Sequence, residues 1–399
     1  MINQIQSAVQ KYQEPITEFL REVIRTDSPS CQEEKVIRLV AAEMERCDFD
    51  EVTIDRLGNV IGRMGSGPLS IMYDAHLDVV LVPDAHKWEH PPFAADLSHG
   101  KIYGRGATDE KPAISGMIYG ARILKELGGL EGITLYVVGS VMEEDCDGYP
   151  LLHIIEQESI KPDFVVLGEP TDLQVFRGHR GRMEMRVRTE GVSAHGAHVD
   201  KGINAVYLMA PIISEIEQLN ERLAVDPFLG KGTVTVSSVK VDTASLCSVP
   251  DGCEIYLDRR LTAGETLDSA LQEIRELPSF KSAKLELLNY DAVSWRGLRA
   301  QQEKYFPTWV LPEEHQLVQA GLATAQQINP GGSNKAGRWT FSTNGVATMG
   351  RLNIPTIGYA PGLEELAHSR NEEVAVADLL KATEFYALLP AELLKRSTV

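Results

Sequence analysis

The sequence has few cysteines, no long apolar run and a shortage of basic residues. Its five cysteines are odd in number and show no CxxC spacing, so we read them as reduced thiols of a reducing compartment. No apolar stretch approaches the roughly 20 residues that span a bilayer. The amphipathic N-terminal pattern also lacks the apolar core and cleavage site of a signal peptide. These features predict a cytoplasmic protein with no membrane partner.

The net charge of −18, from 39 basic and 57 acidic side chains, argues against a nucleic-acid partner. Basic residues do gather in "RGHRGRMEMRVR", residues 177–188. They alternate with apolar residues as in a strand, so a solvated strand face, or one anion-binding arginine, explains them better than a nucleic-acid surface. The expected partner is a small-molecule substrate.

The chain of 399 residues is long enough for a large hydrophobic core and for two domains. Up to about residue 180, strand patterns such as "LSIMYDAHLD" and "GITLYVVGSV" alternate with helical ones such as "ISGMIYGARILKEL". Ser30 and Glu33 add a capping-box start for a helix that begins near residue 33. This alternation predicts an α/β domain whose central sheet has helices on both faces.

The pattern changes near Gly181. From there the order strand–helix–strand–strand–helix–strand predicts a ferredoxin-like α+β sandwich with an antiparallel sheet. We therefore expect an inserted domain over residues 181–292. Residues 1–180 and 293–399 then form the other domain together, closed by a C-terminal helix.

Several polar residues stand where buried strands end, which is where ligand sites form in open α/β sheets. In "MYDAHLDVV", His76 and Asp78 share one face of a strand, and a metal-bound histidine usually donates its other ring N–H to a carboxylate. Asp109 follows a glycine-rich turn, where it could bridge two metal ions, and Glu169 follows another buried strand. Taken singly, each motif also fits an ordinary turn or loop.

The stretch "VVGSVMEEDCDG", residues 137–148, ends a buried strand with four carboxylates. A solvated loop is the simple explanation, and a metal site with a general base is the alternative. Asp145 and Asp147 are expected to be solvated turn residues, because neither motif nor charge requires them. Cys146 is either a reactive thiol or a small residue that fills space.

A late loop, "ELAHSRNEE", adds His368 before the last helix, whose start should include Asn371 and Glu372. A sheet edge could bring together one set of imidazole and carboxylate ligands: His76, Asp109, Glu144, Glu169 and His368. This set suits zinc, with cobalt or manganese as substitutes. Two divalent ions are favoured over one, because about four positive charges balance three carboxylates and one hydroxide.

The segment 181–292 contributes two further candidates. His195, in "GVSAHGAH", could donate to a developing oxyanion, whereas His198 is expected to be a partly exposed loop residue. Arg260, in "LDRRLTAGE", could clamp a substrate carboxylate through two hydrogen bonds.

These motifs together resemble those of the co-catalytic zinc family of aminoacylases and carboxypeptidases, which includes acetylornithine deacetylase, succinyl-diaminopimelate desuccinylase and glutamate carboxypeptidases. The resemblance runs nearly end to end. Its motifs occur in family order: "AHLDVV", "GKIYGRGATDEK", "MEEDCDG", "LGEPT", "SAHGA", "DRRLTAGE", "IPTIGYAPG" and "AHSRNEE". One such motif is weak evidence, but the ordered set is specific.

The resemblance implies a metal-binding role for five residues. His76, Asp109 and Glu169 are similar to the ligands of one metal ion. Asp109, Glu144 and His368 are similar to the ligands of the other, with Asp109 as the bridge.

The resemblance also implies the catalytic roles. Asp78 resembles the carboxylate that orients the metal-bound histidine. Glu143 resembles the general base, which takes a proton from the attacking water and returns it to the leaving amine. The inserted domain resembles the family's lid, which often forms a dimer interface. In dimeric members, a lid histidine like His195 reaches the partner's active site.

Three places depart from the family pattern, one of which is Pro112 after Lys111, where relatives often have glycine. Relatives often carry a "TSDAR"-like stretch before the last strand, and here "FSTNGVATMGR" places Asn344 where an acidic residue helps to read the substrate. A neutral amide favours a different substrate group, so the specificity of the desuccinylase or the deacetylase does not carry over directly. Cys146 and Asp147 replace an "EEGG"-like ending.

We therefore expect a di-zinc hydrolase that cleaves an amide, peptide or carbamoyl C–N bond in a small substrate bearing a carboxylate. Within the enzyme class, a dipeptidase or carboxypeptidase is the alternative to a deacylase. A non-catalytic binding protein on the same scaffold is a further alternative, against which the intact Glu143 and ligand set argue. The last alternative is an interaction protein that dimerises through its lid and holds only a structural metal.

Overall fold

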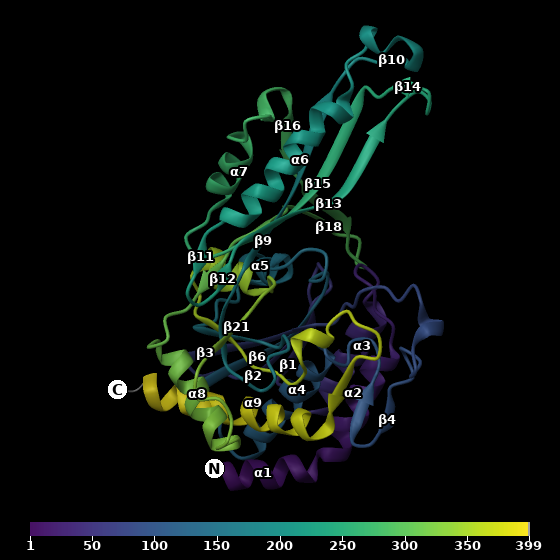
Figure 1. Cartoon of the computed structure of the whole chain (residues 1–399). Coiled ribbons are helices and arrows are strands. Elements are labelled where there is room, and N and C mark those ends of the chain that lie inside the picture. Colours follow the sequence, from purple (N-terminus) through teal and green to yellow (C-terminus); the bar gives the residue numbers. More distant parts are fainter. Residues whose placement is uncertain (398–399) are drawn as a thin grey trace.

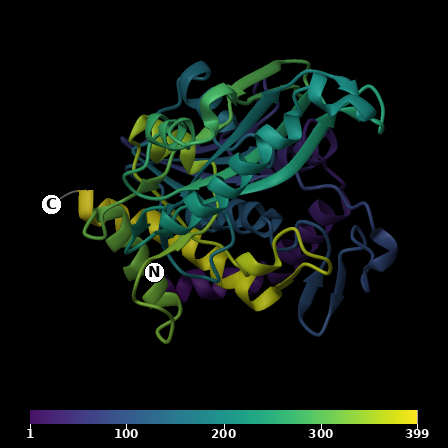
Figure 2. The same cartoon turned by 45° about the horizontal axis from the view of Figure 1, so that its top comes forward.

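The computed structural model describes residues 1–397. The two largest sheets of the described residues lie one in a lower body and one in an elongated arm above it (Figure 1). The first residues of the chain and the end of the described part, at residue 397, lie in the lower body, and the arm is drawn in the teal and green of the middle of the sequence. Figure 2 turns the arm and its long helix α6 (Ala205–Arg222) toward the viewer.

Within residues 1–397, the sheet of the lower body has nine strands. Strands β6, β3, β7 and β22 run parallel in that order, and antiparallel strands extend the sheet on both sides. The strand bounds are β1 Glu51–Ile54, β2 Val60–Gly65, β3 Leu69–His76, β6 Ile133–Ser140, β7 Phe164–Leu167, β8 Phe176–His179, β20 Trp309–Val310, β21 Gly337–Trp339 and β22 Thr356–Gly358. Because parallel strands end at the same edge, the residues after β3, β6 and β7 meet there.

Helices cover both faces of this sheet, as the sequence predicted. Figure 1 shows α1, α4 and α9 on the face away from the arm and α5 on the face toward it. The helix bounds are α1 Ile2–Lys11, α2 Gln13–Arg25, α3 Glu34–Arg46, α4 Lys111–Glu126, α5 Tyr149–Gln157, α8 Gln316–Ile328 and α9 Val376–Ser397. None of the helices in residues 1–397 combines the length and the apolar composition needed to cross a membrane.

The arm has the ferredoxin-like order that the sequence predicted. Its elements are β9 Gly181–Glu190, α6, β13 Thr233–Asp242, β15 Gly252–Leu261, α7 Leu267–Arg275 and β16 Lys284–Leu287. The strands pair antiparallel in the order β13–β15–β9–β16, with β19 (Tyr305–Phe306) added beside β9. The apolar faces of this sheet and its helices form a core of their own.

The chain returns to the lower body through the hairpin of β17 (Asn289–Val293) and β18 (Arg299–Glu303). Tyr290 and Ala300 of this hairpin are buried in the core of the lower body. The predicted domain boundary between residues 292 and 293 falls inside β17, and it stays a prediction. The remaining short strands are β4 Asp96–Ser98, β5 Lys101–Tyr103, β10 Ala194–His195, β11 Val225–Asp226, β12 Gly230–Lys231, β14 Ser248–Val249 and β23 Glu373–Ala375.

Gly358 at the end of β22 makes a close contact that positions the edge of the sheet. A Cβ at Gly358 would lie 2.0 Å from the indole of Trp339. Trp339 donates from Nε1 to the carbonyl oxygen of Pro170 at 3.0 Å. We predict that Gly358→Ala lowers the free energy of unfolding by about 1–3 kcal/mol, the usual effect of overpacking a core.

Urea unfolding followed by circular dichroism measures this effect. Gly331→Ala is the matched control, because a Cβ there meets nothing within 4 Å. The control should change the free energy of unfolding by about 0.5 kcal/mol or less. Equal effects of the two substitutions would contradict the packing argument.

Candidate metal centre

His76, the last residue of β3, is held by the main chain that follows it. Its Nδ1 lies 2.9 Å from the carbonyl oxygen of Asp78 and 3.7 Å from the Asp78 carboxylate. The ring N–H therefore donates to the carbonyl, whereas the sequence predicted that the carboxylate orients this histidine. Because Nδ1 carries the proton, Nε2 is free to act as a ligand.

The carboxylate of Asp78 binds the loop after β6 instead. Its Oδ1 accepts from the N–H of Glu143 at 3.1 Å, and its Oδ2 accepts from the N–H of Glu144 at 3.2 Å and from the hydroxyl of Ser30 at 2.6 Å. The predicted capping box at Ser30 and Glu33 is therefore wrong. Ser30 is engaged with Asp78, and α3 begins at Glu34 with no side-chain cap.

Two more side chains hold the same loop. Asn59 Oδ1 accepts from the N–H of Val141 at 3.0 Å, and Glu33 Oε1 accepts from the N–H of Met142 at 3.1 Å. Four consecutive amides, 141–144, thus donate to side chains rather than to a sheet partner. Their capture fixes the direction in which the side chains of residues 143 and 144 leave the loop.

Glu372 holds the loop that carries Asp109. Its Oε2 accepts from the N–H groups of Gly106 at 3.0 Å and Thr108 at 3.2 Å, while Oε1 pairs with Arg105. The predicted helix start at this residue is wrong, because α9 begins at Val376. Burial raises the pKa of Glu372 to about 7.

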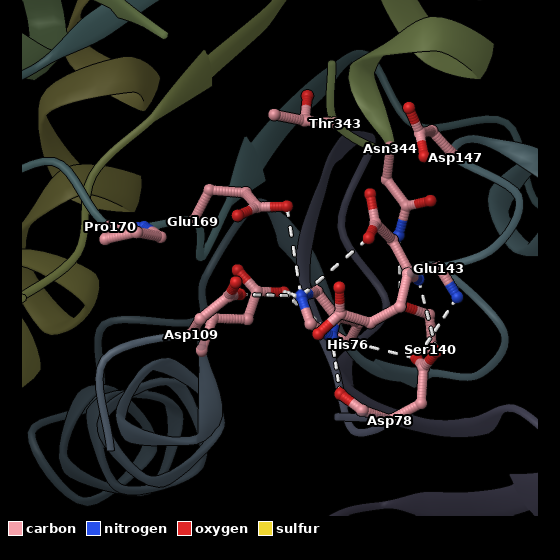
Figure 3. A network of polar contacts seen from close by, with 12 residues as sticks. His76, Asp78, Asp109, Ser140, Glu143, Asp147, Glu169, Pro170, Thr343 and Asn344 are labelled. Atoms are coloured by element: carbon pink, nitrogen blue, oxygen red, sulfur yellow. Dashed lines mark hydrogen bonds and ion pairs between the residues drawn. The ribbon is translucent and has the colours of Figure 1, made fainter. Parts of the chain in front are cut away.

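All five predicted metal ligands meet at this edge of the sheet. Asp109 lies between the two histidines, with Oδ1 3.0 Å from His76 Nε2 and Oδ2 3.2 Å from His368 Nε2. His368 Nε2 is also 2.9 Å from Glu144 Oε2. Glu169 Oε1 lies 3.9 Å from His76 Nε2, and Figure 3 shows its carboxyl group directed at that ring.

Glu110 belongs to the same cluster, although the sequence analysis did not select it. Ligand atoms of His76, Glu110 and Glu169 lie within 4.8 Å of one another, as do those of His76, Asp109 and Glu144. Glu110 Oε1 accepts from the N–H of His76, and its Oε2 is buried with no hydrogen-bond partner among residues 1–397. The one feature of the sequence that could have pointed to Glu110 as a site residue was its position next to Asp109.

Glu143 faces this cluster from the β6 side (Figure 3). Its Oε2 lies 3.9 Å from His76 Nε2, and its Oε1 is buried without a hydrogen-bond partner in the described chain. Burial, and then the negative charge of Asp147, raises the pKa of Glu143 well above its usual value. A carboxyl group with a raised pKa is suited to proton transfer near neutral pH.

Asp147 is buried, so the prediction of a solvated turn residue is wrong. Its Oδ1 accepts from Arg182 at 2.8 Å and its Oδ2 accepts from the hydroxyl of Ser342. Because Arg182 belongs to β9, the pair joins the loop to the arm. Asp145 is exposed, as predicted. Cys146 is a buried filler, and burial raises the pKa of its thiol.

A cavity of about 290 Å³ opens over the cluster. Its lining residues are His76, Asp109, Glu143, Glu144, Asp147, Glu169, Arg182, Arg260, Phe341, Ser342, Glu364, Ala367 and His368. Arg260 lines the cavity, but its Nε and Nη2 are bonded to Asp258 at 2.7 and 3.0 Å. The predicted fork to a substrate carboxylate therefore requires this pair to open.

Asn344 lies behind the cavity lining, where it is buried (Figure 3). Its Nδ2 donates to Asp74 at 2.9 Å and to Ser140 at 3.1 Å, and its Oδ1 accepts from the N–H of Gly148 at 2.8 Å. This differs from the predicted substrate contact, because the amide is engaged with β3, β6 and the start of α5. The geometry gives it a positioning role.

His195 lies at the tip of the arm, away from the lower body (Figure 1). It is exposed, it does not line the cavity, and its Nδ1 accepts from the N–H of Ala197 at 3.0 Å. Its role at an oxyanion stays a prediction, and one that a single chain in this arrangement does not meet. His198 is exposed in a short 3₁₀ segment, as expected.

The donor set fits divalent cations. Burial raises the pKa of both Glu110 and Glu169 well above the usual value, and neighbouring carboxyl groups raise both further. Buried like charges of this kind are costly unless they coordinate metals. A carboxylate oxygen such as Glu110 Oε2, which has no hydrogen-bond partner in the described chain, and an imidazole nitrogen such as His76 Nε2 are ligand types that zinc takes.

Residues 72–392 match the family model described as peptidase family M20/M25/M40. The chain belongs to this family. All of the clustered ligands fall within the M20 match, whereas Glu33 and Asn59, which hold the loop after β6, precede it.

Two curated relatives cover nearly the whole chain. The protein called uncharacterized protein YgeY of Escherichia coli K12 is 45% identical over 381 residues, which are 95% of this chain and 94% of the relative. An acetylornithine deacetylase of Proteus mirabilis is 25% identical over 387 residues, 90% of this chain and 92% of the relative.

Solved M20 structures share the fold. A metallo-carboxypeptidase, Sso-CP2, from Sulfolobus solfataricus superposes with a TM-score of 0.73 at 16% identity, covering 94% of this chain and 98% of the other. The YXEP protein of Bacillus subtilis, described as a dinuclear metal binding peptidase, gives a TM-score of 0.68 at 13% identity, covering 98% and 100%.

The Asn344–Asp74 contact yields a test of the site's support. We predict that Asn344→Asp destabilises the protein, because it puts a carboxylate where the amide now donates to Asp74 at 2.9 Å. An unmet buried acceptor costs about 1–3 kcal/mol, and more when it is charged. Asp74→Asn in the same chain should restore most of the loss, because an amide can donate to the new carboxylate.

Thermal and urea unfolding of the two single variants and the double variant measure this coupling. A double variant no more stable than Asn344→Asp would contradict the proposed pairing.

Proposed function

We propose that this M20 hydrolase cleaves an amide C–N bond, in an N-acyl, peptide or carbamoyl group, of a small substrate that carries a carboxylate. One observation carries the proposal. Two histidines and several carboxylates meet at one cavity together with the buried carboxyl group of Glu143, whose Oε1 has no hydrogen-bond partner among the described residues. A protein that only binds its ligand has no need of such a base.

The metal part of the proposal is a pair of divalent cations, most readily zinc. His76, Asp109 and Glu169 would hold one ion, and Asp109, Glu144 and His368 the other, with Glu110 close to the first. When bound, such ions activate water at neutral pH and polarise the scissile carbonyl group. The dinuclear peptidase from Bacillus subtilis with the same fold supports two ions.

The chain's own residues supply the proton transfer. Glu143 would take the proton from the attacking water and return it to the leaving amine nitrogen. Asp78 would position Glu143, because its carboxylate accepts a hydrogen bond from the backbone amide of Glu143. Burial and the charge of Asp147 raise the pKa of Glu143, and this pKa would fall when cations bind nearby, which restores the basic carboxylate.

Arg182 and Arg260 are the groups proposed to recognise the substrate carboxylate. Both line the cavity, on the side formed by the arm. Arginine suits this task because its fork matches a carboxylate. The acetylornithine deacetylase at 25% identity supports an N-acyl amino acid as one substrate class.

We further propose a cytoplasmic homodimer that forms through the arm. Among the described residues, eight of the fourteen exposed large apolar side chains lie between residues 181 and 292. The long strand β13 is at the edge of its sheet, and unpaired edges are templates for a second chain. Such a dimer is the arrangement in which His195 would reach the partner's cavity.

The catalytic proposal is tested by two neighbouring glutamates. We predict that Glu143→Gln lowers kcat by at least about 100-fold, the lower range for general acid–base catalysis, and keeps its metal. Glu144→Gln should lose metal and activity together, because it removes a ligand charge. Asp145→Asn is the control, since this exposed residue of the same loop should change neither.

Metal analysis and a panel of N-acyl amino acids, N-carbamoyl amino acids and dipeptides provide the measurements. The panel also separates a deacylase from a peptidase. Near-zero metal in folded, active protein would contradict the metal proposal, and near-full activity of Glu143→Gln would contradict the base.

The dimer is tested at β13. We predict that Val239→Lys with Val241→Lys shifts the protein toward monomers, because lysine on an edge strand blocks pairing. Sedimentation equilibrium measures the shift. Val293→Lys is the control, because Val293 is as exposed as Val239, at 55%, but lies in β17. A dimer that is unchanged in the double variant would contradict this interface.

A further inference from the structure

Asp55, His153 and Glu158 form a second group of metal-ligand type, apart from the cavity of the active site. One ligand atom of each lies within 4.8 Å of the others. Asp55 follows β1, His153 lies in α5, and Glu158 is the C-cap residue of α5. Since α5 begins directly after the loop of Glu143, His153 lies about 6 Å and Glu158 about 13 Å further along the helix by helical rise.

His153 is the observation that points to a ligand. Its side chain is 10% exposed, and its Nε2 is buried with no hydrogen-bond partner in the described chain. This atom is directed at Asp55, whose Oδ2 is 4.0 Å away, beyond hydrogen-bond distance. A zinc ion bound to both atoms in tetrahedral geometry would need them roughly 3.4 Å apart, a small adjustment.

Asp55 is fixed before any ion binds. Its Oδ1 accepts from the N–H groups of Gly58 at 2.7 Å and Asn59 at 3.0 Å, and its Oδ2 accepts from Asn59 Nδ2 at 2.7 Å. Oδ2, the oxygen 4.0 Å from His153 Nε2, retains acceptor capacity for a second partner. Hydrogen bonds of this kind orient a ligating carboxylate.

The charges around the group favour a cation. A second cavity of about 290 Å³ lies beside it, and its charged lining residues are Glu51, Asp55, Arg63 and Glu158. The one cation among these is engaged, because Arg63 Nε is bonded to Glu51 at 3.1 Å. Glu158 is exposed, so its carboxylate can adjust to an ion. The end of α5 also carries the negative pole of the helix dipole.

We propose that Asp55, His153 and Glu158 bind one zinc-class divalent cation, separate from the pair at the active site. One imidazole and two carboxylates suit a first-row transition ion better than magnesium or calcium. Bound there, the ion ties the end of α5 to the turn between β1 and β2. Asn59, which donates to Asp55, also accepts from the N–H of Val141, so this site adjoins the loop of Glu143.

Zinc content measured by mass spectrometry after dialysis against buffered free Zn²⁺ tests the proposal. Wild type should hold one more zinc per chain than His153→Gln or Glu158→Gln. Both variants should keep the active-site zinc, because neither residue lines that cavity. Glu156→Gln is the matched control, an exposed carboxylate on the same helix that should leave the zinc content unchanged.

A second measurement uses stability. Zinc added beyond the active-site pair should raise the melting temperature of wild type and Glu156→Gln, and should not raise that of His153→Gln. Glu158 is exposed, so Glu158→Gln keeps the test valid if the histidine variant folds poorly. Equal zinc content in wild type, His153→Gln and Glu158→Gln would overturn the proposal.

Discussion

The catalytic edge of the sheet depends on four consecutive backbone amides that have no strand to pair with. After β6 the chain turns out of the sheet, and Met142 adopts a φ of 62°. Buried amides must still find acceptors. Asn59, Glu33 and Asp78 supply them for residues 141–144, from three different connecting segments. These hydrogen bonds hold the loop in one conformation, and so they set the directions in which the side chains of Glu143 and Glu144 leave it.

The same solution appears on the other side of the cavity, where Glu372 captures the amides around Asp109. Carboxylates thus serve twice in this protein, as anchors of the backbone and as ligands. Packing so many into one region is unfavourable unless cations offset them. The acidic excess of the sequence is in part concentrated here, and a ligand substitution that removes one carboxylate changes the charge balance of the entire cluster.

The alternation of strands and helices was sufficient to predict the two sheets, because local hydrophobic periodicity reports burial directly. The ordered motifs located His76, Asp109, Glu144, Glu169 and His368, which the structure brings together. The residues that hold these ligands in place could not be predicted from the sequence. Asp147 pairs with Arg182 and Ser342, which are 35 and 195 residues away, and Glu372 lies 266 residues from Gly106. Such partners exist only once the chain has folded, and no local pattern encodes them.

Asn344 shows how one such support shapes specificity. Its amide is engaged with Asp74, Ser140 and Gly148 behind the cavity, so the proposed recognition of a substrate would rest on groups that line the cavity. Two of those, Arg182 and Arg260, come from the arm. Arg182 is bonded to Asp147 of the catalytic loop, so the arm's position and the geometry around Glu143 are coupled through one ion pair. A substrate carboxylate that drew Arg182 toward itself would weaken that pair and so act on the base and on the arm at once.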